Sequence, residues 1–228
     1  THVRNMLQRS RAFSSKLNRT LGLSLFGLGS ISSLGMIAAC DAAVAHEEDD
    51  DRNDIHLHRP PAPYQRIDSL LDSTHPEWRR NNAFHGTLRG ENMIEDYEVY
   101  FNPVEKDIIC LVRFGSSLNG HEGIVHGGIT AMTFDNSFGW LFLANKCDPA
   151  FTANIHVNYR QKVPANSLVY LKAKFTDISG RKLYMGGTME DVDGNVLADA
   201  TCLFITVKNV KDYKGGLPAS KKESTESA

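Results

Sequence analysis

The sequence has few cysteines and no excess of positive charge. Its four cysteines lie far apart and form no C-x-x-C pair, so neither a zinc site nor a disulfide framework is predicted. Most of them lie in apolar runs, where free cysteine is a small buried hydrophobe. The formal net charge of -2 gives no basis for nucleic-acid binding, which requires clustered Lys and Arg. A small-molecule partner is favoured, and we predict no metal and no cofactor.

Acidic side chains are missing from the N-terminus, where no Asp or Glu precedes Asp41. Several Arg and Ser residues occur there instead. Arg-rich, Ser-rich and acid-poor segments are typical of organellar presequences, which form basic amphipathic helices. Arg11-Ala12-Phe13-Ser14 is similar to a mitochondrial presequence cleavage site. We therefore predict a mitochondrial targeting sequence over 1–19, and a disordered basic tail is the alternative.

Charged residues are also absent between Thr20 and Ala39. This run is moderately apolar and just long enough to span a bilayer, which takes about 20 residues. Its glycines and serines weaken the signal, although small residues also make transmembrane helix contacts. Three interpretations stay open: a single-pass inner-membrane anchor over 20–40, a second sorting signal that is removed, or a bacterial-type signal that ends in Cys40. We favour the anchor, and the side of the membrane is left open.

The rest of the chain divides into a linker, a folded domain and a tail. An acidic block and three prolines predict a solvated linker over 41–63. From Tyr64 onward the chain has the density of apolar and aromatic residues that a core requires, so one domain is expected over 64–213. Residues 214–228 are polar without periodicity and are expected to be disordered.

Alternation of side chains predicts an antiparallel sheet. Between 152 and 160 apolar and polar residues alternate, as in a half-buried strand. Ser179-Gly180 and Asp193-Gly194 are hairpin turn signals between later β-rich runs. One or two short helices, interrupted at Pro76, are expected before the first strand. The other expected strands are 98–101, 107–114, 168–177, 182–190 and 196–207.

One long helix is expected between the early and late strands. Residues 127–144 carry apolar side chains on every face, which indicates a buried helix. An antiparallel sheet needs its apolar face covered, and a central helix can cover it. The predicted fold class is therefore α+β, with an antiparallel sheet wrapped around a long central helix.

A single carboxylate, Asp135, interrupts this apolar helix. It is flanked by Phe134 and Phe138, and its local sequence offers no cation to pair with it. A carboxylate in an apolar setting is costly, so it persists where it is hydrogen-bonded or used in chemistry. The alternative is an exposed aspartate on a wet stripe with Asn136. We favour the functional interpretation.

The triplet His126-Gly127-Gly128 precedes the helix. Backbone N–H groups at a helix start have no intrahelical partner and lie at the positive end of the helix dipole. Such preorganised donors stabilise an oxyanion, which develops on a thioester carbonyl during attack. Taken alone, the triplet is equally compatible with an ordinary glycine-rich turn.

Three motifs occur in order: His126-Gly127-Gly128 followed by Asp135, then Thr152-Ala153-Asn154, then Asn158-Tyr159-Arg160. Together they resemble the motifs of the hotdog-fold acyl-CoA thioesterases of the PaaI-like group, and the similarity covers about 115–207. The resemblance implies a hotdog fold and a homodimer or dimer of dimers of the 4-hydroxybenzoyl-CoA thioesterase type. It also implies hydrolysis of acyl-CoA to a carboxylic acid and CoA.

The resemblance further implies roles for individual residues. In the family, the aspartate matching Asp135 is general base or nucleophile, and the amide matching Gly128 polarises the thioester carbonyl. The histidine matching His126 supports the loop, and a hydroxyl matching Thr152 positions water or the carboxylate. The substrate-binding candidates are Gly127, Asn154, Arg160 and Arg181, the two arginines as contacts for CoA phosphates.

Helix geometry adds an expectation about assembly. Gly128 and Asp135 are seven residues apart, which is about 10 Å of axial rise on one helix. One carbonyl cannot reach both, because a donor and a base must each lie within about 3 Å of the reacting groups. We therefore expect Gly128 of one subunit to work with Asp135 and Thr152 of its partner, so that activity requires a dimer.

Other functions stay open at this point. A membrane-tethered acyl-CoA-binding or scaffold protein would keep the fold without turnover, and hotdog hydratase chemistry is disfavoured by the spacing of its histidine and carboxylate. Hotdog domains host several chemistries, so the fold alone selects none. Phe138, Trp140 and Phe142 are candidates for an apolar acyl tunnel, but core packing explains them equally well. The acyl chain length cannot be read from the sequence.

Overall fold

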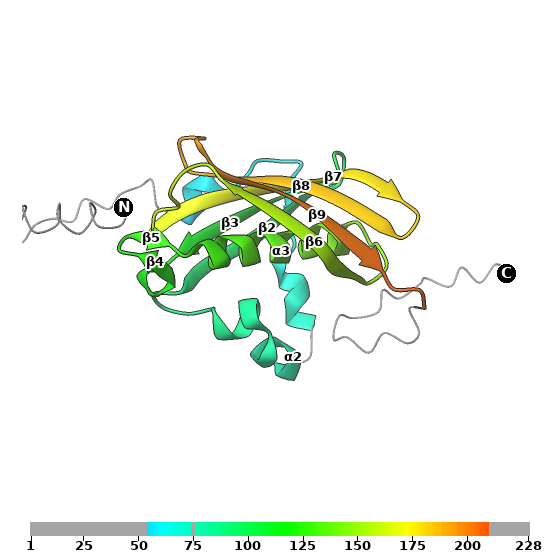
Figure 1. Cartoon of the computed structure of the whole chain (residues 1–228), viewed down its shortest axis with the longest axis horizontal. Coiled ribbons are helices and arrows are strands. Elements are labelled where there is room, and N and C mark those ends of the chain that lie inside the picture. The colour runs from blue at the N-terminus through cyan, green and yellow to red at the C-terminus, as the bar shows by residue number, and fades with distance from the viewer. Residues whose placement is uncertain (1–53, 74–75, 210–228) are drawn as a thin grey trace, which may run out of the picture. The chain divides into compact units, whose positions relative to one another are not determined.

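The computed structural model describes residues 54–73 and 76–209 (Figure 1). All of them belong to the second of two structural units, Asp49–Ala228. The predicted targeting sequence, the hydrophobic segment, most of the linker and the 214–228 tail lie outside the described residues. Within the described part, no helix has the length and apolar character needed to cross a membrane.

The main sheet is antiparallel, as predicted. Its strands are β1 (Gln65–Arg66), β2 (Ile94–Asn102), β3 (Asp107–Phe114), β6 (Ala150–Tyr159), β7 (Ser167–Ser179), β8 (Lys182–Glu190) and β9 (Val196–Thr206). They run in the order β1-β2-β3-β7-β8-β9-β6, so that β6 lies at one edge (Figure 1). The short strands β4 (Asn119–His121) and β5 (Ile124–Val125) form a separate pair just before the long helix.

Two glycine turns fold the C-terminal meander. Ser179 pairs with Lys182, so Gly180 and Arg181 form a two-residue hairpin loop. Gly180 has a φ of 59°, and Gly194 in the next turn has a φ of 84°. These values lie in the left-handed region, which glycine adopts without steric cost. Both turn predictions are confirmed.

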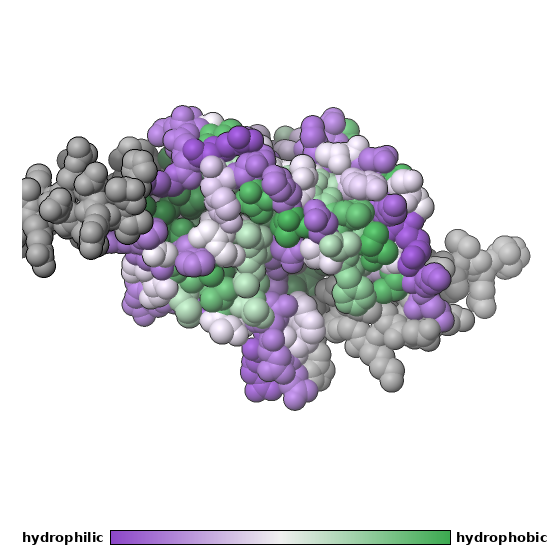
Figure 2. All heavy atoms as spheres, viewed as in Figure 1, coloured by the Kyte–Doolittle hydropathy of each residue, from purple (hydrophilic) through white to green (hydrophobic). Residues whose placement is uncertain are grey.

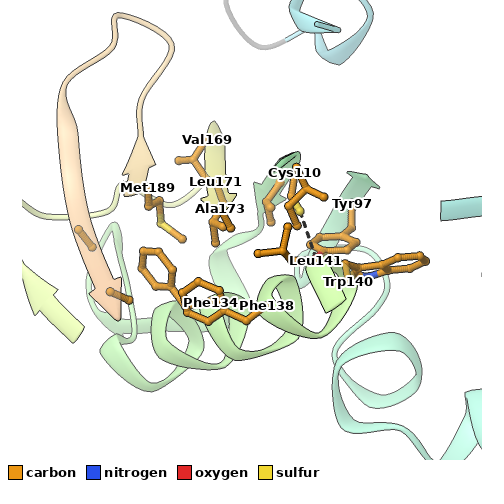
Figure 3. Close-up of a cluster of buried hydrophobic side chains, with 14 of the residues drawn as sticks. Tyr97, Cys110, Phe134, Phe138, Trp140, Leu141, Val169, Leu171, Ala173 and Met189 are labelled. Atoms are coloured by element: carbon orange, nitrogen blue, oxygen red, sulfur yellow. Dashed lines mark hydrogen bonds between the residues drawn. The ribbon is translucent and has the colours of Figure 1, made fainter. Parts of the chain in front are cut away.

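The long helix α3 (Gly127–Ala144) packs against the sheet. Phe134, Phe138 and Leu141 are fully buried, and Figure 3 shows them in one cluster with Leu171 and Met189 of the sheet. The expected central helix is confirmed. Its burial is uneven, however, because the helix also carries half-buried and exposed residues on the sides that turn away from the sheet.

A helical segment between β1 and β2 contacts α3. It consists of η3 (Asp68–Ser73), α2 (Pro76–Asn81) and η4 (Ala83–Thr87), and η4 contacts both α2 and α3. Phe84 of η4 is buried, and its ring centroid lies 4.9 Å from that of Tyr97. Figure 1 draws α2 below α3, away from β7 and β8, and Figure 2 shows the surface of α2 as hydrophilic. The expected short helices around Pro76 are thus present.

The described end of the predicted linker packs onto the sheet. Ile55 in η2 (Ile55–His58) is buried in a second hydrophobic cluster. The strand residues of this cluster alternate with the residues that face α3, so the cluster lies on the other face of the sheet. Arg59 forms an ion pair of 2.6 Å with Glu98 on the same face. One apolar side chain and one ion pair therefore hold this end of the linker on the sheet, while most residues of 54–63 are exposed.

Candidate functional site

Asp135 and Thr152 meet between α3 and the edge strand β6. The hydroxyl of Thr152 donates a hydrogen bond of 2.7 Å to Oδ1 of Asp135, across 17 positions of sequence. The pairing of β6 with β9 shifts register between Thr152 and Asn154. Such a bulge re-aims a side chain within a strand. The structure therefore brings together the two residues that the sequence predicted to cooperate.

The carboxylate of Asp135 is less enclosed than its neighbours in the sequence suggest. Phe134 and Phe138 are fully buried, whereas Asp135 and Asn136 are half-buried. The reason is helical geometry, because Phe134 and Phe138 share one face of α3 and Asp135 lies about 100° further round. Asp135 lies outside the dry core and lines a cavity.

This cavity has a volume of about 240 Å³ and is mostly apolar. Two stripes of α3 form one wall, Asp135-Gly139-Phe142 and Asn136-Trp140-Leu143, each at the three- or four-residue spacing of one helix face. Residues Ala150 to Thr152 of β6 and the segment from Trp78 to His85 form other walls. Of the aromatic candidates for an acyl tunnel, Trp140 and Phe142 line the cavity and Phe138 does not.

His85 is a wall residue that the sequence did not single out. Its ring lies among aromatic rings, with centroids 5.9 Å from Tyr97 and 6.2 Å from Trp140. Burial, with the nearby charges of Arg89 and Arg79, lowers the pKa of His85 to about 4. The side chain of Asn136 opposes this shift, and its Nδ2 donates to the Tyr97 hydroxyl at 3.0 Å. His85 is therefore neutral at pH 7.

The start of α3 is capped by His126. The Gly128 N–H donates to Nδ1 of His126 at 2.9 Å, and the Tyr159 hydroxyl donates to the Gly127 carbonyl at 2.8 Å. His126 thus supports the helix start, as the resemblance implies. For the Gly127 N–H, no acceptor is found among the described residues. Among the described residues, the amide of Gly128 therefore has an acceptor and that of Gly127 has none.

The remaining residues that were predicted to bind substrate do not lie together. Asn154 is exposed on β6. Arg160 is ion-paired with Asp199, and Arg181 donates to the carbonyl of Thr206 at 3.0 Å. Asp199 and Thr206 are seven residues apart on β9, which is about 23 Å at the usual rise of an extended strand. The two arginines of one chain are therefore not placed to hold one phosphate group together.

Metal-binding side chains do not gather in the described part of the chain. No group of three or more His, Cys, Asp or Glu side chains that could hold a metal occurs within 54–73 and 76–209. The cysteines that lie there, Cys110, Cys147 and Cys202, are free. Burial raises the pKa of Cys110 to about 11, and Figure 3 shows this residue beside Tyr97 in the core.

Known proteins share the segment that carries these residues. Residues 122–198 match the model of the thioesterase superfamily. Acyl-coenzyme A thioesterase THEM4 of Rattus norvegicus is 34% identical over 111 residues, covering 48% of this chain and 47% of the relative. A protein of Candida albicans named as an uncharacterized mitochondrial protein is 25% identical over 144 residues, covering 59% of this chain and 64% of the relative.

A solved thioesterase superfamily protein is 20% identical, with a TM-score of 0.49 over 66% of this chain and 71% of the other. The chain spans about half the length of the rat relative. The motifs, the sheet around α3 and the family match agree. Residues 122–198, from the turn before α3 to the start of β9, match the thioesterase superfamily, and the described part of the chain has an antiparallel sheet packed on one long helix, which is the hotdog type of fold.

Proposed function

We propose that this protein is an acyl-CoA thioesterase, which hydrolyses acyl-CoA to a free carboxylic acid and CoA. The observation that carries the proposal is the hydrogen-bonded pair of Asp135 and Thr152 on the wall of a mostly apolar cavity. A cavity of this kind suits an acyl chain, with a few polar groups to orient the reacting end. The name of the rat relative, acyl-coenzyme A thioesterase THEM4, supports acyl-CoA as the substrate class.

The carboxylate can act in two ways. As a general base, Asp135 takes a proton from water while the water oxygen attacks the thioester carbonyl; as a nucleophile, it attacks the carbonyl itself, and water then hydrolyses the anhydride. In both cases the C–S bond breaks and the CoA thiolate leaves and is protonated. Thr152 donates to Oδ1, so it fixes the carboxylate and leaves Oδ2 for water or substrate.

An amide at the start of α3 would hold the oxyanion. The sequence points to Gly128, but its N–H is engaged by His126 at 2.9 Å. We propose that the neighbouring Gly127 is the donor in this arrangement, because the described contacts leave its N–H available. Gly128 could serve only if the His126 ring released it. The helix dipole favours negative charge at either amide.

A second copy of the chain would complete the site. Within one chain the glycine pair and Asp135 are separated along α3, so they cannot both reach one carbonyl. The edge strand β6 has a neighbour on one side only in the described sheet, and its Tyr159 is 53% exposed. An edge strand with an exposed aromatic residue is suited to pairing with another copy. The proposed unit is a homodimer or a dimer of such dimers.

Replacement of the carboxylate tests the proposed activity. We expect Asp135→Asn to lower kcat by about 100-fold or more, since general base catalysis contributes on that order. CoA release would be followed with a thiol reagent across a panel of acyl-CoA esters. Asp177→Asn is the matched control, because Asp177 is exposed near the β7–β8 hairpin. Equal turnover by Asp135→Asn and the parent would remove Asp135 from the mechanism, and tight binding without any product would indicate a non-catalytic acyl-CoA-binding protein.

We also propose a mitochondrial location. The basic, acid-poor N-terminal composition supports it, as does the name of the Candida albicans relative, which describes that protein as mitochondrial. The inner-membrane anchor over 20–40 stays a prediction. Fractionation of cells that express the tagged full chain tests the organelle, and alkaline extraction of the membranes tests the anchor, because an integral anchor keeps the protein in the pellet.

A further inference from the structure

A second cavity adjoins the one beside Asp135. It has a volume of about 180 Å³, and Leu71 and His85 line both cavities. Its other lining side chains are predominantly charged, in contrast to the apolar first cavity, and they include Arg79 and Arg89. The neutral His85 therefore stands between an apolar chamber and a charged one.

The two arginines carry buried donors without acceptors. Nη1 of Arg89 and Nε of Arg79 are buried and have no hydrogen-bond partner among the described residues. Arg89 makes no ion pair within 54–73 and 76–209, and burial lowers its pKa from the ordinary value. An unsatisfied buried donor on a charged group is costly, so each such group calls for an explanation. A bound anion would satisfy both.

The acidic residues of this cavity are already paired. Asp68 accepts from Arg66 at 2.7 and 2.9 Å, and Asp72 lies 3.3 Å from the other end of the Arg79 guanidinium. The nearby Asp96 is paired with Arg113 at 2.8 Å. These pairs leave the charge of Arg89 without a direct counter-ion. Arg89 is therefore the charged residue of this cavity without an ion pair among the described residues, and one of its buried N–H groups has no acceptor there.

We propose that the second cavity binds a carboxylate through Nη1 of Arg89 and Nε of Arg79. Guanidinium–carboxylate hydrogen bonds are charge-assisted and stronger than neutral ones. The carboxylate could be the far end of an acyl chain that reaches past His85 from the first cavity, which would make dicarboxylyl-CoA esters the preferred substrates. It could also be a free small carboxylate. The first possibility, a carboxylate at the end of an acyl chain, rests on the proposed thioesterase function. The second, a free small carboxylate, does not.

Turnover of matched substrates tests the acyl source. Suberoyl-CoA and octanoyl-CoA have equal chain length and differ by the terminal carboxylate. We expect suberoyl-CoA to have a kcat/KM at least about tenfold higher, in keeping with a hydrogen bond to a charged group. Arg89→Gln should abolish this preference, and Arg89→Lys should keep part of it. Arg80→Gln is the control, because it removes the same charge from an exposed position of α2 and should leave the preference unchanged.

Binding of free suberate tests the cavity without any chemistry. Suberate should raise the thermal unfolding temperature of the parent and of Arg80→Gln, but not that of Arg89→Gln. Such a shift without a turnover preference identifies a free carboxylate as the ligand. If no acyl-CoA ester is hydrolysed but the shift occurs, the thioesterase proposal fails and the carboxylate site stands. Absence of both the turnover preference and the shift overturns the site. Arg89→Lys, which keeps the charge, replaces Arg89→Gln in the binding comparison if the latter does not fold, and it should then show a reduced shift.

Discussion

Single side chains near the cavity differ in how strongly their surroundings constrain them. His85 is the most perturbed histidine of the described chain, because it is enclosed by aromatic rings and faces the charges of Arg79 and Arg89. Both effects disfavour the imidazolium form. A neutral His85 can accept or donate a hydrogen bond at the junction of the two cavities. The lowered pKa of His85 also makes the stability of the fold depend on pH.

The pKa of His85 predicts a loss of stability in acid. Between pH 6.5 and 4 the unfolded chain binds a proton at His85 that the folded chain does not, so this contribution is complete above pH 6.5 and falls as the pH is lowered. At pH 5 we expect it to have lost about 2 kcal/mol. The free energy of unfolding, measured in urea, should fall less between pH 7.5 and pH 5 in His85→Phe than in the parent, and the difference should be about this amount. The exposed His121→Phe is the control, and an unchanged drop in His85→Phe would refute the assignment.

At the scale of elements, close approach between strands β7 and β8 depends on Gly187. This residue pairs with Ala173 across the two strands. A Cβ at Gly187 would lie 2.5 Å from the backbone carbonyl oxygen of Lys172, whereas a Cβ at Gly186 would meet a Thr176 methyl group at 3.3 Å. Backbone cannot rotate out of the way as a side chain can. An added side chain should therefore be tolerated less well at Gly187 than at Gly186.

Alanine substitution of these glycines tests the packing of the meander. We expect Gly187→Ala to lower the free energy of unfolding by about 1–3 kcal/mol, the usual cost of overpacking, and Gly186→Ala to change it less. Urea denaturation of the two variants and the parent at pH 7.5 measures the difference. Equal midpoints for the two variants would show that β7 and β8 separate without cost at Gly187.

At the scale of the whole molecule, the proposed site needs residues from two chains. Gly127 is the first residue of α3, where proline is well tolerated in a helix. The preceding His126 has φ of -61° and ψ of 133°, which is compatible with a following proline. Gly127→Pro therefore removes the proposed oxyanion donor at a backbone position that suits proline, and the Tyr159 ring, 3.3 Å from an added Cβ, must shift by a few tenths of an ångström. This variant removes a backbone N–H group of the proposed site, as Asp135→Asn removes its carboxylate.

Mixed dimers test whether the site is shared. Each variant alone should be nearly inactive, because every site lacks either the donor or the carboxylate. A dimer of one Gly127→Pro chain and one Asp135→Asn chain, purified through two different tags, holds one intact site if the two residues act across the interface. It should then have about half the turnover of the parent dimer. An inactive mixed dimer would place both residues in the same chain's site, and full activity of Gly127→Pro by itself would make Gly128 the donor.

The sequence by itself determined the elements and the central chemical pair. The alternation in β6, the turn glycines and the apolar length of α3 are local patterns, since backbone geometry links them directly to strand, turn and helix. The same patterns placed Asp135 on α3 and Thr152 on β6, and the motif resemblance joined them. Only the tertiary structure decided what faces that pair. His85 and Arg89 reach the cavities because η4 and its flanks pack beneath α3, a long-range contact that no local period encodes. The occupation of the Gly128 amide by His126 likewise follows from a side-chain orientation that only folding fixes.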